Sequence, residues 1–149
     1  MIIETIGLGM LMSLVLTEIV GMAAGGIVVP GYIALSLHRP WELGVTMLVA
    51  FVTLLIIKIL SRFVILFGRR MLVVSILLGY FLVYLATQIP GWLQFPSYLT
   101  FFPIGFVIPG LIAYWMERQG ILETICAMFI AATATRFIII IISQGMVFK

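Results

Sequence analysis

Three basic side chains inside long apolar runs are the residues of this sequence most able to do chemistry. Lys58 and Arg62 stand four residues apart in one run, so they share a face if that run is helical, and Arg136 lies well inside another. Placing a charge within a membrane-spanning segment costs about 3 kcal/mol on insertion scales. The pattern therefore predicts a basic path for an anionic substrate. The alternative is that these side chains snorkel to an interface, which we prefer for Arg62 because it stands close to the end of its run.

An acidic side chain in the first apolar run has two interpretations. Glu18 could carry a coupling proton, or it could form an ion pair with Lys58. We prefer the ion pair, because a nearby cation keeps a carboxylate ionised. The sequence has no phosphate-binding glycine loop, no nucleophile with a histidine and an acid, and no cluster of metal ligands. We therefore expect no catalytic residue, no metal site and no cofactor in this chain.

A nine-residue motif occurs twice, at residues 26–34 and, 79 residues later, at 105–113, with six identical positions. The two copies lie in short apolar elements, residues 23–37 and 106–116. Proline lacks a backbone donor and glycine tolerates most backbone conformations, so each copy predicts a broken helix. Paired breaks in two halves of a chain are typical of transporter sites. The residues that define these broken elements are Gly26, Pro30, Gly31, Gly105, Pro109 and Gly110.

The composition indicates an integral membrane protein. Of the 149 residues, 64% are hydrophobic and 9% are charged, whereas about a quarter of a soluble domain is charged. We expect an all-α polytopic fold in the lipid bilayer, with one transmembrane domain over residues 1–149 built from two duplicated halves, about 1–70 and 71–149. The net charge of +3 is small, and we expect no nucleic-acid partner. Four long spans are predicted at residues 2–22, 43–67, 71–89 and 121–143, with the two short broken elements between them.

Two membrane topologies remain open. If each short element re-enters and returns, the chain crosses four times; if each one crosses, the chain crosses six times and its halves are inverted. The loop around Arg69 and Arg70 is expected in the cytoplasm under the positive-inside rule. Six crossings would place Glu18 in the same half of the membrane as Lys58 and Arg62, so charge pairing favours six, while the shortness of the two elements favours four. We prefer six.

Several of these features together resemble the CapC/PgsC family, the small membrane subunit of the bacterial poly-γ-glutamate (capsule) synthase. They are the two Pro-Gly elements, Glu18 twelve residues before Pro30, the run 67–70 (Phe-Gly-Arg-Arg) and the turn 118–120 (Arg-Gln-Gly). The resemblance covers essentially the whole chain. It implies a multi-pass protein of the bacterial cell (plasma) membrane that takes part in poly-γ-glutamate biosynthesis.

The resemblance also implies partners. A ligase subunit of the CapB/PgsB type, with ATP and a divalent metal, would join the glutamates, and a membrane-anchored CapA/PgsA-type subunit would assist export. This chain would dock the ligase and guide the poly-γ-glutamate polyanion outward, and we expect it not to be catalytic alone. Docking is assigned to Arg69, Arg70, Arg39 and Arg118, and the substrate path to Lys58, Arg62, Arg136 and Glu18. A homo-oligomer is compatible with the sequence.

Two other functions are compatible with the same residues. The chain could be a stand-alone small transporter or channel for an organic anion, because the duplicated broken elements would serve that activity equally well. It could also be a structural anchor without a conduit. Anion uptake by the purified chain in liposomes would favour the transporter.

Overall fold

The computed structural model describes residues 2–37, 39–65, 67–88 and 105–142, and every regular element in these ranges is an α-helix. Four helices are long and apolar enough to cross a membrane: α1 (Ile2–Val20), α3 (Pro40–Phe63), α4 (Arg69–Gln88) and α6 (Ile121–Ile142). The four long spans expected from the sequence are therefore confirmed, with ends that differ by up to four residues. The expected linker at 90–103 lies outside the described residues.

Two short helices complete the described fold, α2 (Val29–Ser36) and α5 (Ile108–Gln119). Pro30 and Pro109 lie in their first turns, where a missing backbone donor costs nothing because the first turn has no partner for it. The sequence analysis expected a helix broken at each Pro-Gly pair. In the structure the non-helical backbone comes before each pair, and the pair itself lies in the first turn of a helix. Residues 21–28, ahead of α2, are non-helical, and Gly26 in that segment has a φ of 118°, a backbone conformation that glycine adopts without strain.

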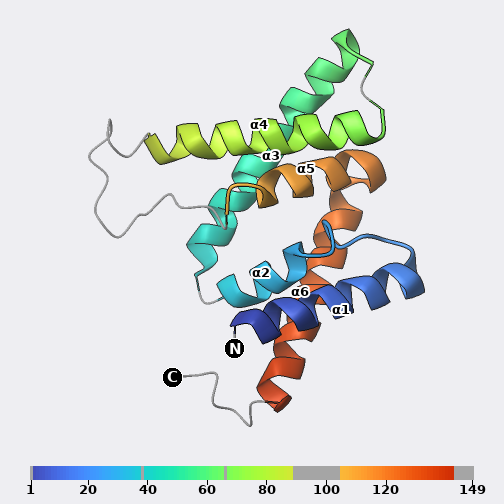
Figure 1. Cartoon of the computed structure of the whole chain (residues 1–149), viewed down its shortest axis with the longest axis vertical. Coiled ribbons are helices and arrows are strands. Elements are labelled where there is room, and N and C mark those ends of the chain that lie inside the picture. The colour runs from blue at the N-terminus through green and yellow to red at the C-terminus, as the bar shows by residue number, and fades with distance from the viewer. Residues whose placement is uncertain (1, 38, 66, 89–104, 143–149) are drawn as a thin grey trace.

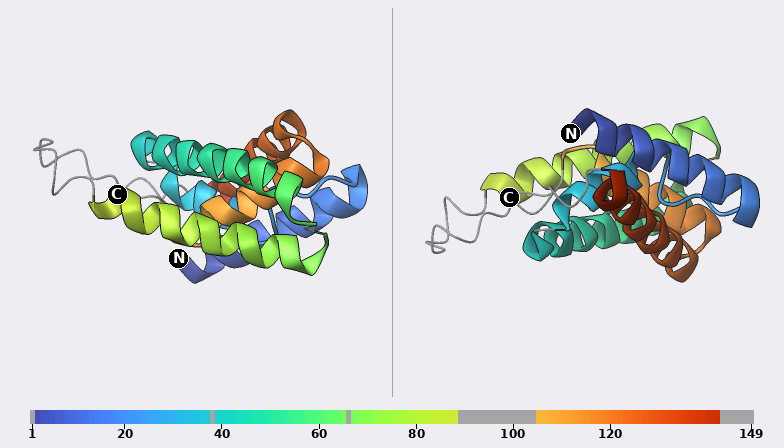
Figure 2. Two further views of the ribbon diagram at one scale, coloured as in Figure 1. Left: turned by 90° about the horizontal axis from the view of Figure 1, so that it is seen from above. Right: turned by 90° about the horizontal axis from the view of Figure 1, so that it is seen from below.

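α1, α2, α4 and α5 lie close to the horizontal axis of Figure 1, whereas α3 and α6 are steeply inclined to it. Along that axis α1 and α5 run towards the right and α2 and α4 towards the left, while α3 rises from left to right and α6 descends with only a small leftward component (Figure 1 and Figure 2). The turn between α3 and α4 and the turn between α5 and α6 therefore lie at one end of the bundle, which we call the α3–α4 end. The turn between α2 and α3 lies at the opposite end, where α1 begins.

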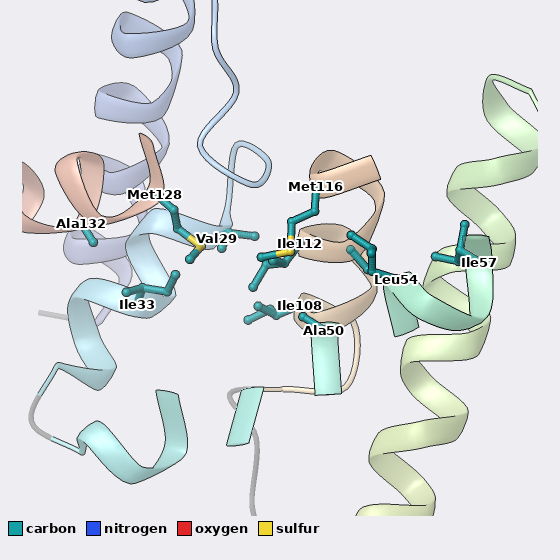
Figure 3. Close-up of a cluster of buried hydrophobic side chains, with 11 residues drawn as sticks. Val29, Ile33, Ala50, Leu54, Ile57, Ile108, Ile112, Met116, Met128 and Ala132 are labelled. Carbon is teal, nitrogen blue, oxygen red and sulfur yellow. The ribbon is translucent and has the colours of Figure 1, made fainter. Parts of the chain in front are cut away.

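The two short helices occupy the centre of the bundle. α2 packs against α1 and α6, while α5 packs against α4 and α3, and the two short helices also touch each other. The side chains between them are apolar and buried, as Figure 3 shows. They include Val29 and Ile33 from α2, Ile108 and Ile112 from α5, Leu54 from α3 and Met128 from α6.

Each short helix crosses a long helix at a contact between glycines. Gly9 of α1 lies against the backbone of Gly31 in α2, and Gly79 of α4 lies against that of Gly110 in α5. A Cβ atom built on Gly79 would lie 2.6 Å from the backbone nitrogen of Gly110, which is too close for any side chain. The Pro-Gly glycines therefore serve close helix packing, since small residues let two backbones approach.

Candidate functional site

Basic side chains gather at the α3–α4 end. Lys58 and Arg62 lie in the last turns of α3, Arg69 and Arg70 open α4, and Arg118 is near the end of α5. These are five of the eight Lys and Arg residues of the chain, and all five are exposed. None forms an ion pair with another described residue. At the opposite end Arg39 is neutralised by Glu42, 2.9 Å away. The α3–α4 end therefore carries unpaired positive charge that exceeds the negative charge of Glu117 and Glu123 at the same end.

The guanidinium of Arg118 is held by two aromatic side chains of its own helix. Its Nη1 donates a hydrogen bond to the hydroxyl oxygen of Tyr114, at 2.8 Å. Its central carbon lies 6.0 Å from the ring centre of Trp115, which is within the range of a cation–π interaction. Tyr114 is itself almost fully buried. Since both neighbours restrict the rotamer of Arg118, its remaining donors have a defined direction.

Two cavities flank the end of α5, and Glu117 borders both. The first has a volume of about 560 Å³ and lies where the end of α3, the start of α4 and the end of α5 converge. The second, of about 570 Å³, lies between α3 and the α5–α6 turn and adds Lys58 and Glu123. Both volumes are within the range of small-molecule sites. The first cavity is lined by Ser61, Ile65, Phe67, Gly68, Met71, Tyr114, Glu117 and Arg118.

A glutamine that the sequence interpretation left without a role connects the two halves of the chain. The side-chain amide of Gln119 accepts a hydrogen bond from the backbone nitrogen of Ala23 at 3.0 Å. It donates to the carbonyl oxygen of Ala23 at 2.5 Å and to the hydroxyl of Thr124 at 3.1 Å. Gln119 therefore satisfies backbone groups of the non-helical segment 21–28. In the sequence, this role of Gln119 is indicated only by the presence of an amide side chain at the end of an apolar segment.

The expected ion pair between Glu18 and Lys58 is not formed among the described residues. Both side chains are exposed, and in the part of the chain that the structure describes α1 contacts α2 and α6 but not α3. The prediction of six crossings therefore loses the support of an ion pair between Glu18 and Lys58. The positions of the turns at the two ends of the bundle bear on the number of crossings without depending on that ion pair.

The remaining residues of the predicted path do not lie together. Lys58 and Arg62 border a shared surface hollow on α3. Arg136 is half-buried on α6, fifteen residues from the start of that helix and so about 22 Å along it from the α3–α4 end. Pro30 and Pro109 are buried beside the apolar centre. The centre between the two Pro-Gly elements is thus packed with hydrocarbon, and the basic side chains of α3 point away from it.

Comparisons with known proteins agree on one family, CapC. The family model for capsule biosynthesis CapC matches residues 8–125. The capsule biosynthesis protein CapC of Bacillus anthracis is 36% identical over 129 residues, and the PGA biosynthesis protein CapC of Bacillus subtilis (strain 168) is 35% identical over 133 residues. Each alignment covers 86% of this chain and 86% of the relative. No solved structure matches.

Proposed function

The chain belongs to the capsule biosynthesis CapC family, and from this premise we propose that it is a multi-pass membrane subunit of a poly-γ-glutamate synthase. It docks the cytoplasmic ATP-dependent ligase of the CapB/PgsB type and works beside a CapA/PgsA-type subunit. ATP and the divalent metal belong to the ligase, which performs the amide-forming step. The relatives' names, which speak of capsule and PGA biosynthesis, support the assignment to this pathway.

The observation that carries the docking role is the unpaired excess of positive charge at the α3–α4 end. Under the positive-inside rule, the end with the excess of Lys and Arg faces the cytoplasm. Arg69 and Arg70 are exposed in the first turn of α4 and lack a partner among the described residues. An acidic surface of the ligase would bind them by electrostatic complementarity, which also speeds association. Arg118 belongs to the same end, whereas Arg39 lies at the opposite one and is assigned no contact with the ligase.

A charge-reversal experiment tests the docking role. The double variant Arg69→Glu/Arg70→Glu should abolish co-purification of the ligase and reduce polymer output at least tenfold, while the chain still reaches the membrane. Arg39→Glu is the matched control, because it reverses an exposed arginine at the other end of the bundle. Retention of the ligase by the double variant, at normal membrane levels, would contradict the proposal.

Polymer guidance is the second part of the proposed function. The polymer is a polyanion, so exposed Lys58 and Arg62 are suited to contact it along α3. Because the centre of the bundle is apolar, a path would follow the outside of α3 or a surface shared with a partner, and Arg136 would join it only at the far part of α6. Lys58→Ala and Arg136→Ala should each lower polymer output without loss of the ligase. Normal output from both variants would leave the chain as an anchor only.

The arrangement of the helices supports six crossings and two inverted halves as the topology for this function. α1, α2, α4 and α5 alternate in direction along the horizontal axis of Figure 1, and the Gly9–Gly31 contact in the first half has a counterpart at Gly79 and Gly110 in the second. In this topology residues 21–28 together with α2 form the second crossing. Their non-helical backbone is tolerated because protein groups, Gln119 and Ser13, satisfy it.

A stand-alone organic-anion transporter is the alternative function. Such a transporter would need a polar route between the two Pro-Gly elements, and the described residues there are apolar. Uptake of glutamate or a similar anion by the purified chain in liposomes, without the ligase, would favour this alternative over the synthase subunit.

A further inference from the structure

Glu117 stands out among the acidic residues because it is half-buried and has no partner among the described residues. It borders both cavities at the α3–α4 end. Its neighbour in sequence is Arg118, but adjacent residues of a helix point about 100° apart and do not face each other. Lys58 borders the second cavity with Glu117 and forms no ion pair with it. Glu117 thus shares one cavity with Arg118 and the other with Lys58, and it forms an ion pair with neither.

The two signs of charge restrict what the site can hold. Arg118 is oriented by Tyr114 and Trp115, and a guanidinium with free donors binds carboxylates well. An internal stretch of a polyanion offers carboxylates only, so Glu117 would repel it. A ligand that carries an ammonium group close to a carboxylate satisfies both charges. In a γ-linked glutamyl chain only one residue has these two groups together, namely the terminal residue whose amino group is not acylated.

We propose that the cavity formed by Ser61, Gly68, Met71, Tyr114, Glu117 and Arg118 binds the free amino end of a γ-glutamyl chain. Arg118 binds the α-carboxylate of the terminal residue, and Glu117 binds its ammonium group. The inference rests on the proposed function and deepens it by naming the part of the polymer that this chain recognises. The volume of about 560 Å³ accommodates a small ligand, and its position beside Arg69 and Arg70 places the chain end next to the docked ligase.

The test uses the purified full-length chain in nanodiscs of uncharged phosphatidylcholine, without the ligase. The probes are two γ-linked glutamate pentamers labelled at the carboxyl end, one with a free amino end and one N-acetylated. The chain should bind the free-amine pentamer at least about tenfold more tightly. Arg118→Gln should weaken both pentamers about tenfold or more, because a charged hydrogen bond is lost. Glu117→Gln should remove the preference for the free amine. Arg39→Gln, at the opposite end, should change neither affinity.

Several outcomes would overturn the proposal. Equal affinity for the two pentamers excludes a site for the amino end. Displacement of both by glycerol 3-phosphate would assign the cavity to a phosphate or lipid headgroup. A Glu117→Gln chain that keeps the preference, while its circular dichroism matches the parent chain, would exclude the role of Glu117.

The same measurements separate this inference from the proposed function. If Arg69→Glu/Arg70→Glu abolishes polymer output but Glu117→Gln and Arg118→Gln do not affect pentamer binding, the cavity assignment fails and the synthase role stands. If the binding pattern is as expected but cells lacking the chain make normal amounts of polymer, the synthase role fails and the binding site stands.

Discussion

At the scale of single residues, Gln119 shows how this chain tolerates irregular backbone in a membrane. Backbone groups in lipid have no water to bond with, and each unsatisfied group costs several kcal/mol. Ala23 lies outside any helix and is buried, yet both its N–H and its carbonyl are bonded by the amide of Gln119. One side chain of the second half therefore stabilises the non-helical segment of the first.

Gln119→Ala should lower the free energy of unfolding by about 2 kcal/mol or more, since it leaves two buried backbone groups unpaired. Thermal unfolding in nanodiscs measures the effect. Gln88→Ala is the control, because Gln88 is an exposed glutamine at the end of α4. If both variants shift the midpoint equally, the hydrogen bonds of Gln119 do not contribute to stability.

At the scale of elements, the glycine contacts decide which helices become neighbours. At Gly9 of α1 and Gly79 of α4 the backbone of another helix lies so close that an added Cβ would meet it within 2.6 Å. Gly31 and Gly110 supply the opposite surfaces, next to prolines that begin α2 and α5. The Pro-Gly pair thus has two functions: proline starts the short helix, and glycine lets it cross a long one.

Gly9→Ala and Gly79→Ala should each destabilise the fold by about 1–3 kcal/mol, the usual cost of overpacking, because the added methyl group meets backbone atoms that cannot move aside. Gly7→Ala is the matched control on α1, where nothing lies within 4 Å of the new Cβ, and it should be neutral or stabilising by about 1 kcal/mol or less. Chemical unfolding in detergent measures all three. Stability of Gly9→Ala equal to that of Gly7→Ala would contradict the close contact.

At the scale of the whole molecule, the ends at which the turns between helices lie (Figure 1) have a consequence for topology. In six crossings the α3–α4 and α5–α6 turns face the same side, and the α2–α3 turn faces the other. In four crossings the α5–α6 turn would instead share a side with the α2–α3 turn. The position of residue 118 therefore distinguishes the two topologies.

Cysteines placed singly at positions 39, 69 and 118 in a Cys126→Ala background should settle the matter in intact cells. We expect a membrane-impermeant maleimide to label position 39 from outside, and positions 69 and 118 only after the cells are permeabilised. Position 69 serves as the internal reference for the cytoplasmic side. Labelling of position 118 in intact cells would indicate four crossings.

Much of this fold could be predicted because the relevant signals are local. Long apolar runs predict spans from hydropathy and length alone, and the bounds of α1, α3, α4 and α6 agree with them to within a few residues. The Pro-Gly elements were also located correctly along the chain. The sequence did not predict where each break lies relative to its helix. A proline within an apolar run predicts a break, but whether the break lies inside a helix or before it depends on which backbone groups the neighbouring helices can hydrogen-bond.

The candidate site was predicted only in part. The sequence predicted a basic cytoplasmic loop at Arg69 and Arg70 and grouped Arg39 and Arg118 with it for docking, but Arg39 lies at the opposite end of the bundle, paired with Glu42. The pairing of Glu18 with Lys58 could not be judged, since similar depth in a membrane does not make two helices neighbours. Glu117 and Tyr114 carried no sequence signal at all, because a polar residue near a helix end is ordinary until a cavity forms beside it.

The sequence by itself determined that this chain is helical, with four runs long and apolar enough to cross a membrane, two Pro-Gly elements and an excess of positive charge in particular turns. Only the tertiary structure decided that α1 meets α2 and α6 but not α3, that Gln119 bonds Ala23, and that Glu117 and Arg118 share a cavity. The physical reason is that hydropathy sets how deep each residue lies along the membrane normal. Which helices touch is set instead by the fit of their surfaces, here at contacts that only glycine permits.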